Sequence, residues 1–166
     1  MPVSSNVRPH MPVTSARKLL VAVQLLERAV ELHLRGDSFY ASIHLSAAAE
    51  EILNVYARQV TLDDGSQFKP SFDEAKDAMV TTLNPQTDLQ RQAAEKWAYD
   101  RLTRAKNIVK HMRGPKDTQV NMDAEVESDD CLDRAISTYF RIQPIAGLPL
   151  IYLIQAFDRA RQGSRL

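Results

Sequence analysis

Apolar residues recur along this chain at the three- and four-residue spacing of an amphipathic α-helix, which limits the fold more than any other feature. The clearest case is the stretch 15–35, where Leu19, Val23, Leu26 and Val30 form one row and charged residues cover the opposite side. The chain has only 5 glycines, and no segment has the pattern of a strand. We therefore predict an all-α protein.

Start and stop signals divide the chain into about five to six helices. Gly36 ends the first helix, and Asp37 directly after it caps the second, so the two form an antiparallel hairpin. Ser71 opens a capping-box pattern, while Ser128 and Pro144 should begin and end the fifth helix. We expect an up-down helical bundle with helices at 15–35, 37–60, 71–82, 87–111, 128–144 and 149–163.

The apolar faces of these helices predict one hydrophobic core. The second helix should face the core with Ala41, Leu45, Ala48, Ile52 and Val55. The fourth should do so with Ala94, Ala98, Leu102, Ala105, Val109 and Met112. Across the chain, the residues expected to be buried are Leu26, Leu45, Ile52, Leu102 and Ile136.

A chain of 166 residues can bury one core as a single domain. We expect a flexible tail at 1–13, which lacks the apolar stretch of a signal peptide, and one helical-bundle domain at 14–166. The most apolar stretch, Ile142–Phe157, falls short of the ~20 residues that span a bilayer, so no membrane partner is expected. The single Cys131 fits a reducing, cytoplasmic location.

Several classes of function lose their sequence support. The 21 basic residues balance the 21 acidic ones, so any binding of nucleic acid must depend on a local patch. The chain contains no Glu-x-x-His, no His-x-x-x-His, no cysteine pair and no glycine-rich phosphate loop. We therefore predict neither a metal site nor a cofactor.

The fourth predicted helix carries the candidate chemistry. Arg104, Asn107 and His111 are three and four residues apart, so they share one stripe of that helix. A guanidinium, an amide and an imidazole are groups that metal-free cleavage of a phosphodiester would use. Two polar residues seven apart also occur on many solvated helix faces, so a structural role stays open. Further candidate binding residues are Trp97, Lys110 and Arg113, on or near the stripe, and Glu50 of the second helix, which could reach a neighbouring helix or site.

A second pattern lies in the segment Asp37–Leu53, where an aromatic-rich start leads into an Ala-rich run, Glu50 and a leucine. This segment resembles the HEPN superfamily of small helical proteins, with Glu50 at the glutamate position. The Asn-x-x-Lys-His segment Asn107–His111 is similar to one in a group of small, uncharacterised bacterial proteins. The resemblance extends over roughly 15–140, mostly through architecture.

Active HEPN proteins are metal-independent endoribonucleases whose Arg-x4–6-His motif pairs across a dimer. The resemblance therefore implies a toxin or defence ribonuclease with Arg104, Asn107 and His111 at a dimer cleft. His111 would transfer protons, Arg104 would stabilise the phosphorane, and Asn107 would orient the ribose hydroxyl or His111. The implied partners are a second copy, RNA or a nucleotide, and an antitoxin-type nucleotidyltransferase.

The alternative hypothesis is a non-catalytic helical module. In that case the same stripe would serve dimerisation, docking of a partner or binding of a nucleotide. Under either hypothesis, the simpler interpretation of Glu50 is a solvated acid at a helix edge. The zero net charge and the presence of Ala105, where active HEPN proteins often have a polar residue, favour this module. The cations around His111 favour the enzyme.

Overall fold

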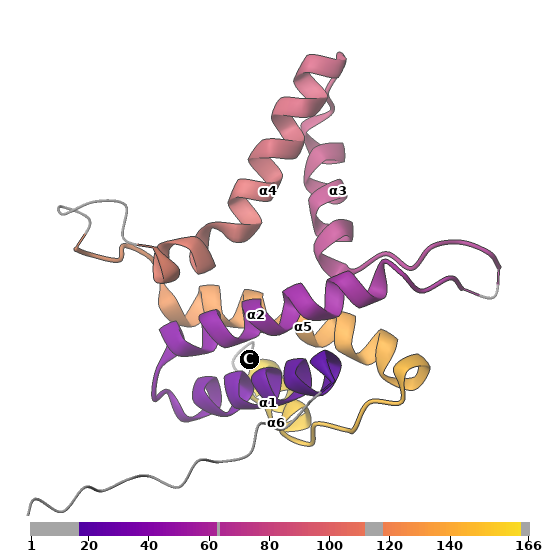
Figure 1. Ribbon diagram of the computed structural model, residues 1–166. Coiled ribbons are helices and arrows are strands. Elements are labelled where there is room, and N and C mark those ends of the chain that lie inside the picture. Colours follow the sequence, from indigo (N-terminus) through magenta and orange to yellow (C-terminus); the bar gives the residue numbers. More distant parts are fainter. Residues whose placement is uncertain (1–16, 63, 112–117, 164–166) are drawn as a thin grey trace, which may run out of the picture.

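The computed structural model describes residues 17–62, 64–111 and 118–163. Their regular structure is helical, with one isolated antiparallel bridge between Thr61 and Gln67 (Figure 1). The all-α prediction is thus confirmed. The helices are α1 (Lys18–Arg35), α2 (Phe39–Ala57), α3 (Ser71–Leu83), α4 (Asp88–Lys110), α5 (Ala124–Ala146) and α6 (Leu153–Gly163). Among the helices described, none has both the length and the apolar character needed to cross a membrane.

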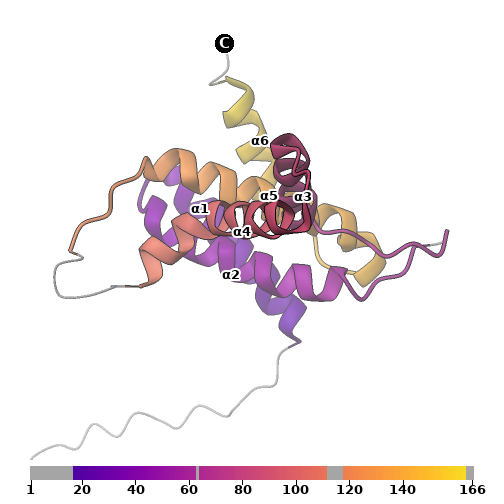
Figure 2. The ribbon, with the colours of Figure 1, turned by 90° about the horizontal axis from the view of Figure 1, so that it is seen from above.

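Helices α1, α2, α5 and α6 form a compact body, from which α3 and the first part of α4 project. In the body, α2 packs between α1 and α5, and α6 covers α1 (Figure 1). Helix α3 and the part of α4 that packs against it, as far as Tyr99, form a helical hairpin, here called the arm, that stands away from the body. Viewed from above, the last turns of α4 lie between α2 and α5 (Figure 2). One helix therefore belongs to both regions.

The body has a core of large side chains contributed by all four of its helices. Hydrophobic burial of such side chains is the main force that stabilises a fold. The prediction that Leu26 and Ile136 are buried is confirmed. The largest fully buried apolar side chains of this core are Leu26, Val30, Leu53, Leu132, Tyr139, Ile142, Ile154 and Phe157.

The arm has a much thinner apolar seam. Val80 of α3 packs against Ala94 and Ala98 of α4, with Met79 partly buried beside them. At the base of the arm, the rings of Phe72 and Tyr99 meet edge to face with their centroids 5.9 Å apart. Because two of the three buried residues are alanines, this seam removes little surface from water.

The buried face of α2 differs from the predicted one. Val55 is 57% exposed, and Leu45 and Ile52 are only half-buried, as is Leu102 of α4. The predicted seam is therefore wrong in part, because α2 is covered on two sides and its buried sector is wider than one apolar stripe. The sector turned toward α4 and α5 contains a buried polar row of Ser42, Ser46, Glu50 and Asn54.

Two predicted helix caps are wrong, although the third helix does begin at Ser71 as predicted. Helix α2 is capped by Ser38, whose Oγ accepts a hydrogen bond from the Ala41 amide at 3.2 Å, and not by Asp37. Helix α3 has Pro70 at the N-cap position, without a side-chain cap. Ser71 is instead the first helical residue. Its backbone N–H donates to Thr138 Oγ1 at 3.1 Å and its hydroxyl to Ser137 Oγ at 2.9 Å, contacts between distant segments that a local pattern does not reveal.

Both predicted ends of α5 are wrong as well. Asp123 caps the helix, accepting from the Val126 amide at 3.2 Å, and the helix continues through Pro144 to Ala146. Pro144 has no N–H to donate to the carbonyl of Phe140, so the last turn of the helix lacks that hydrogen bond. Gly147 then ends the helix in the left-handed conformation, at φ 61°.

Ser128, the expected cap, instead joins a buried chain of hydrogen bonds across three helices. The Ser42 hydroxyl donates to the Ala29 carbonyl at 2.9 Å, and the Ser128 hydroxyl donates to Ser42 Oγ at 2.9 Å. His33 Nδ1 lies 2.9 Å from Ser128 Oγ. Burial lowers the pKa of His33, which the nearby Asp129 partly opposes. The chain fixes α1, α2 and α5 against one another.

Candidate functional site

The sequence-predicted site residues lie on the last turns of α4, where that helix rests on the body. Arg104 is exposed and points toward the start of α5: its guanidinium lies 3.5 Å from the Asn121 carbonyl and 3.9 Å from the Glu127 carboxylate. His111 follows the last residue of α4, is exposed, and donates its backbone N–H to the Asn107 carbonyl at 3.1 Å.

Asn107 lies on another side of the same helix. Its Nδ2 donates to Thr103 Oγ1 at 3.3 Å, and the Thr103 hydroxyl donates to the Tyr99 carbonyl at 2.9 Å. Asn107 and Lys110 line a groove between α2 and α4, whose described walls do not include Arg104 or His111. The fold therefore brings Asn107 and Lys110 together and leaves Arg104 and His111 on the neighbouring surface.

Two of the other predicted binding residues lie away from the groove. Trp97 is 50% exposed on the arm, one and two heptads before Arg104 and His111, so the three share the exposed face of α4. Arg113 lies outside the described residues, as do the predicted tail at 1–13 and the predicted start of the first helix at 15.

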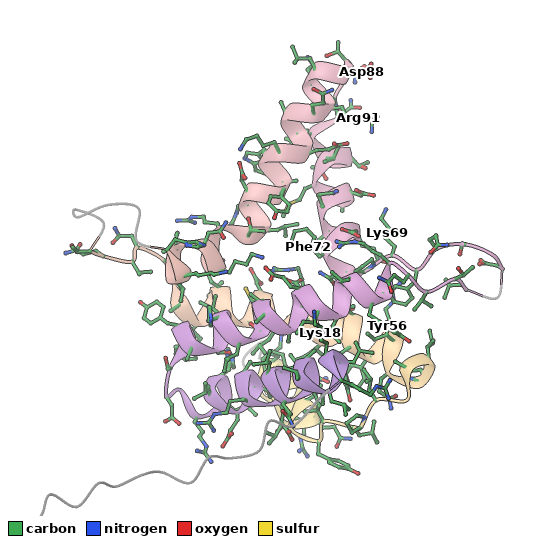
Figure 3. All side chains as sticks on the ribbon, viewed as in Figure 1. Lys18, Tyr56, Lys69, Phe72, Asp88 and Arg91 are labelled. Atoms are coloured by element: carbon green, nitrogen blue, oxygen red, sulfur yellow. The ribbon has the colours of Figure 1, made fainter. Side chains whose placement is uncertain are left out.

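The groove consists of two adjoining pockets. The outer pocket has a volume of about 230 Å³, and the inner pocket one of about 330 Å³. The outer pocket is lined by His44, Ala47, Ala48, Glu51, Tyr99, Lys106, Asn107 and Lys110. The inner pocket is lined by Glu50, Glu51, Asn54, Val55, Arg58, Phe72, Tyr99, Thr103 and Lys106. Figure 3 shows Phe72 at the base of α3, where the arm meets the body.

Glu50 is buried and lines the inner pocket, so its interpretation as a solvated acid is wrong. It is 4% exposed, and its Oε1 accepts from Arg134 Nε of α5 at 3.0 Å. Arg134 also reaches the Leu102 carbonyl of α4 at 3.4 Å. Burial raises the pKa of Glu50, while the charge and hydrogen bond of Arg134 oppose that rise. This ion pair therefore links α2 and α5 directly under α4.

The chain matches no known protein-family model, and neither a curated protein nor a solved structure shows significant similarity to it. The site has to be judged on its own chemistry. Among the residues described, no cluster of three or more histidine, cysteine and acidic side chains has the arrangement to hold a metal ion. The available groups are cations, imidazoles, amides and carboxylates.

Several groove residues were missed in the sequence. Lys106 lies about 140° around the helix from His111, so the polar stripe did not include it. It forms an ion pair with Glu51 across the groove. His44 and Asn54 come from α2, and no local spacing connects them with α4. Arg134 of α5, which pairs with the lining residue Glu50, was missed for the same reason. The available signal was the row at 42, 46, 50 and 54, which repeats every four residues and marks one helix face.

Proposed function

We propose that this protein is a HEPN-like, metal-independent endoribonuclease that binds single-stranded RNA along the last turns of α4. The observation that carries this proposal is the group of cations and imidazoles around one short surface. Lys106 and Lys110 line the outer pocket together with Asn107 and His44. Arg104 and His111 are exposed on the adjoining face of the same helix. Such a patch attracts phosphates although the whole chain is electrically neutral.

The reaction we propose uses the RNA's own nucleophile. The 2′-oxygen attacks the adjacent phosphorus, and the bond from phosphorus to the 5′-oxygen breaks. His111 takes the proton of the 2′-hydroxyl, and His44, as the second imidazole near the groove, supplies a proton to the leaving 5′-oxygen. Arg104 offers a planar fork to the phosphorane oxygens. The products are a 2′,3′-cyclic phosphate and a 5′-hydroxyl.

A second copy would complete this site. Trp97, Arg104 and His111 share the exposed face of α4, so pairing of two such faces would bring two sets of these residues together. Asn107 lines the groove, so of its two expected roles it would orient the ribose hydroxyl of the RNA and not the imidazole of His111.

The test is cleavage of labelled single-stranded RNA in EDTA, with product ends identified by mass. Wild type should release cyclic phosphate ends, His111→Ala should lose activity, and Arg104→Lys should also fail because lysine lacks the fork. Arg91→Ala is the matched control, since Arg91 is a cation of α4 near the tip of the arm (Figure 3). Cleavage that needs magnesium, or that persists in His111→Ala, would refute the assignment.

The arm favours a second candidate, a non-catalytic interaction module. It exposes large apolar side chains: Leu89 is 78% exposed, and Leu83 and Trp97 are each 50% exposed. If docking is the function, wild type should cleave no RNA, and Trp97→Ala should abolish self-association in sedimentation velocity. A monomer at micromolar concentration in wild type would remove both the composite active site and the homodimeric module.

A further inference from the structure

The inner pocket is lined by a buried asparagine whose amide oxygen has no hydrogen-bond partner among the described residues. Asn54 is 5% exposed and lines this pocket, yet its Oδ1 accepts no hydrogen bond. Almost all buried polar atoms in proteins have a partner. An unpaired acceptor at the wall of a pocket is therefore a site where a ligand donor would gain a strong contact.

A second acceptor lies one helical turn away. Glu50 precedes Asn54 by four residues on α2, so the two side chains lie on the same face. Arg134 bonds the Oε1 atom of Glu50, which leaves Oε2 as the second acceptor. Two neighbouring acceptors match a group that offers two N–H donors, such as an amino group on a ring.

The opposite wall is aromatic. Phe72 is buried, and Tyr99 is half-exposed against it in edge-to-face contact. A half-exposed tyrosine ring offers a surface on which a flat heterocycle stacks. The shape and the contacts of the pocket thus favour a planar ligand.

The charges around the pocket are already paired. Arg58 makes two hydrogen bonds of 2.8 Å to Asp73, Lys106 pairs with Glu51, and Arg134 pairs with Glu50. A ring bound here should therefore be uncharged. Lys110 lines the adjoining outer pocket, where a phosphate attached to such a ring would find a cation.

We propose that the inner pocket binds adenine. The adenine amino group would donate to Asn54 Oδ1 and Glu50 Oε2, Asn54 Nδ2 would donate to N7, and the ring would stack on Tyr99. An asparagine paired with N6 and N7 is a common mode of adenine recognition. The adenine comes either from a free nucleotide or from RNA, and in the second case the inference rests on the proposed function and names the base beside the cleaved bond.

The primary test is calorimetric titration of the full chain with AMP and with IMP. The two ligands differ at the position of the amino group, where IMP has a carbonyl that would face the acceptors of Asn54 and Glu50. AMP should bind at least tenfold more tightly. Equal binding of AMP and IMP, or binding of neither to the folded protein, would overturn the proposal.

Variants identify the residues responsible. Asn54→Leu has a similar volume and should lose the preference for AMP, whereas Tyr99→Ala should weaken both ligands equally. Lys96→Ala, which removes an exposed cation paired with Asp100, should change neither. Thermal melting checks that each variant is folded. A preference for AMP that persists in folded Asn54→Leu would also refute the site.

Oligonucleotides separate the two sources of adenine. If RNA is the source, oligoadenylate should bind more tightly than both AMP and oligouridylate, and cleavage in EDTA should favour bonds next to adenine. If a free nucleotide is the source, AMP should bind as tightly as oligoadenylate. Cleavage of RNA together with equal binding of AMP and IMP would support the ribonuclease and refute the adenine pocket. A preference for AMP without cleavage would do the reverse.

Discussion

The body and the arm are built from the same kind of element but bury very different amounts of apolar surface. Leu26, Leu53 and Tyr139 are completely covered in the body, whereas the arm closes over Val80 and two alanines. Isolated helices of this length are marginal in water without packing. The body can therefore support its own fold, while the arm depends on its base or on a partner. Helix α4 joins a stable region to a weakly supported one, and the groove lies at their junction.

The largest effect should come from breaking the ion pair at this junction. Arg134→Met would leave the buried carboxylate of Glu50 without its partner, which typically costs about 3–5 kcal/mol. Urea unfolding would measure the loss. Glu50→Gln combined with Arg134→Met is the control, because it removes the uncompensated charge and should recover much of the stability. A single variant as stable as wild type would show that the pair contributes nothing.

A large truncation in the body should come next. Leu53→Ala removes a fully buried side chain and should lower the free energy of unfolding by about 2–5 kcal/mol. The whole chain should unfold at lower urea concentration, as followed by circular dichroism. A change below 1 kcal/mol would mean that the body is not the stable region.

The matching truncation in the arm should cost less and act locally. Val80→Ala removes two carbons from the seam, about 1.5 kcal/mol at most. Hydrogen exchange should show faster opening of amides in α3 and the first half of α4, with those of α2 unchanged. If α2 exchanged equally faster, the arm and the body would form a single cooperative unit.

A smaller change in the free energy of unfolding should come from the titration of His33, which lies in the body. Because the pKa of His33 is lowered in the folded state, the unfolded state binds the proton first as pH falls below about 6.5. The free energy of unfolding should therefore decrease as the pH falls from about 6.5 to the pKa of His33 in the folded protein. In His33→Gln, which can still donate to Ser128, this part of the pH dependence should vanish. An unchanged profile would assign it to other groups.

The smallest effect on stability is expected at the tip of the arm. Leu89→Ser changes an exposed side chain and should alter the free energy of unfolding by less than about 0.5 kcal/mol. If self-association is detected, this variant should weaken it in sedimentation velocity. A strong loss of stability at low protein concentration would mean that Leu89 packs within its own chain.

Helix α1 illustrates what periodicity can predict. Leu19, Val23, Leu26 and Val30 are all buried, because this helix has one apolar side and packs with it. Helix α2 illustrates the limit. Its row from Ser42 to Asn54 is polar and buried, which hydrophobicity alone could not predict, and Glu50 of this row had been expected in solvent.

The site was predictable only as far as one helix extends. Helix geometry predicted Arg104, Asn107 and His111 on one stripe of α4, but the first two contact different parts of the protein. Asn107 donates to Thr103 within α4 and lines the groove, whereas Arg104 approaches Glu127 of α5. Arg134 comes from α5 and lies 24 residues after Lys110, the last residue of α4, so no local pattern predicts its contact.

The buried hydrogen bonds that connect Ala29, Ser42, Ser128 and His33 also determine the position of a proton on the His33 ring. Each serine hydroxyl has one hydrogen: that of Ser42 points to Ala29, and that of Ser128 points to Ser42. Ser128 Oγ must therefore accept from His33, so the neutral ring carries its hydrogen on Nδ1 and its lone pair on Nε2. A protonated ring would keep the same bond, which agrees with burial as the main cause of the lowered pKa. The tautomer of His33 is thus dictated by a carbonyl of its own helix, through two hydroxyls on other helices.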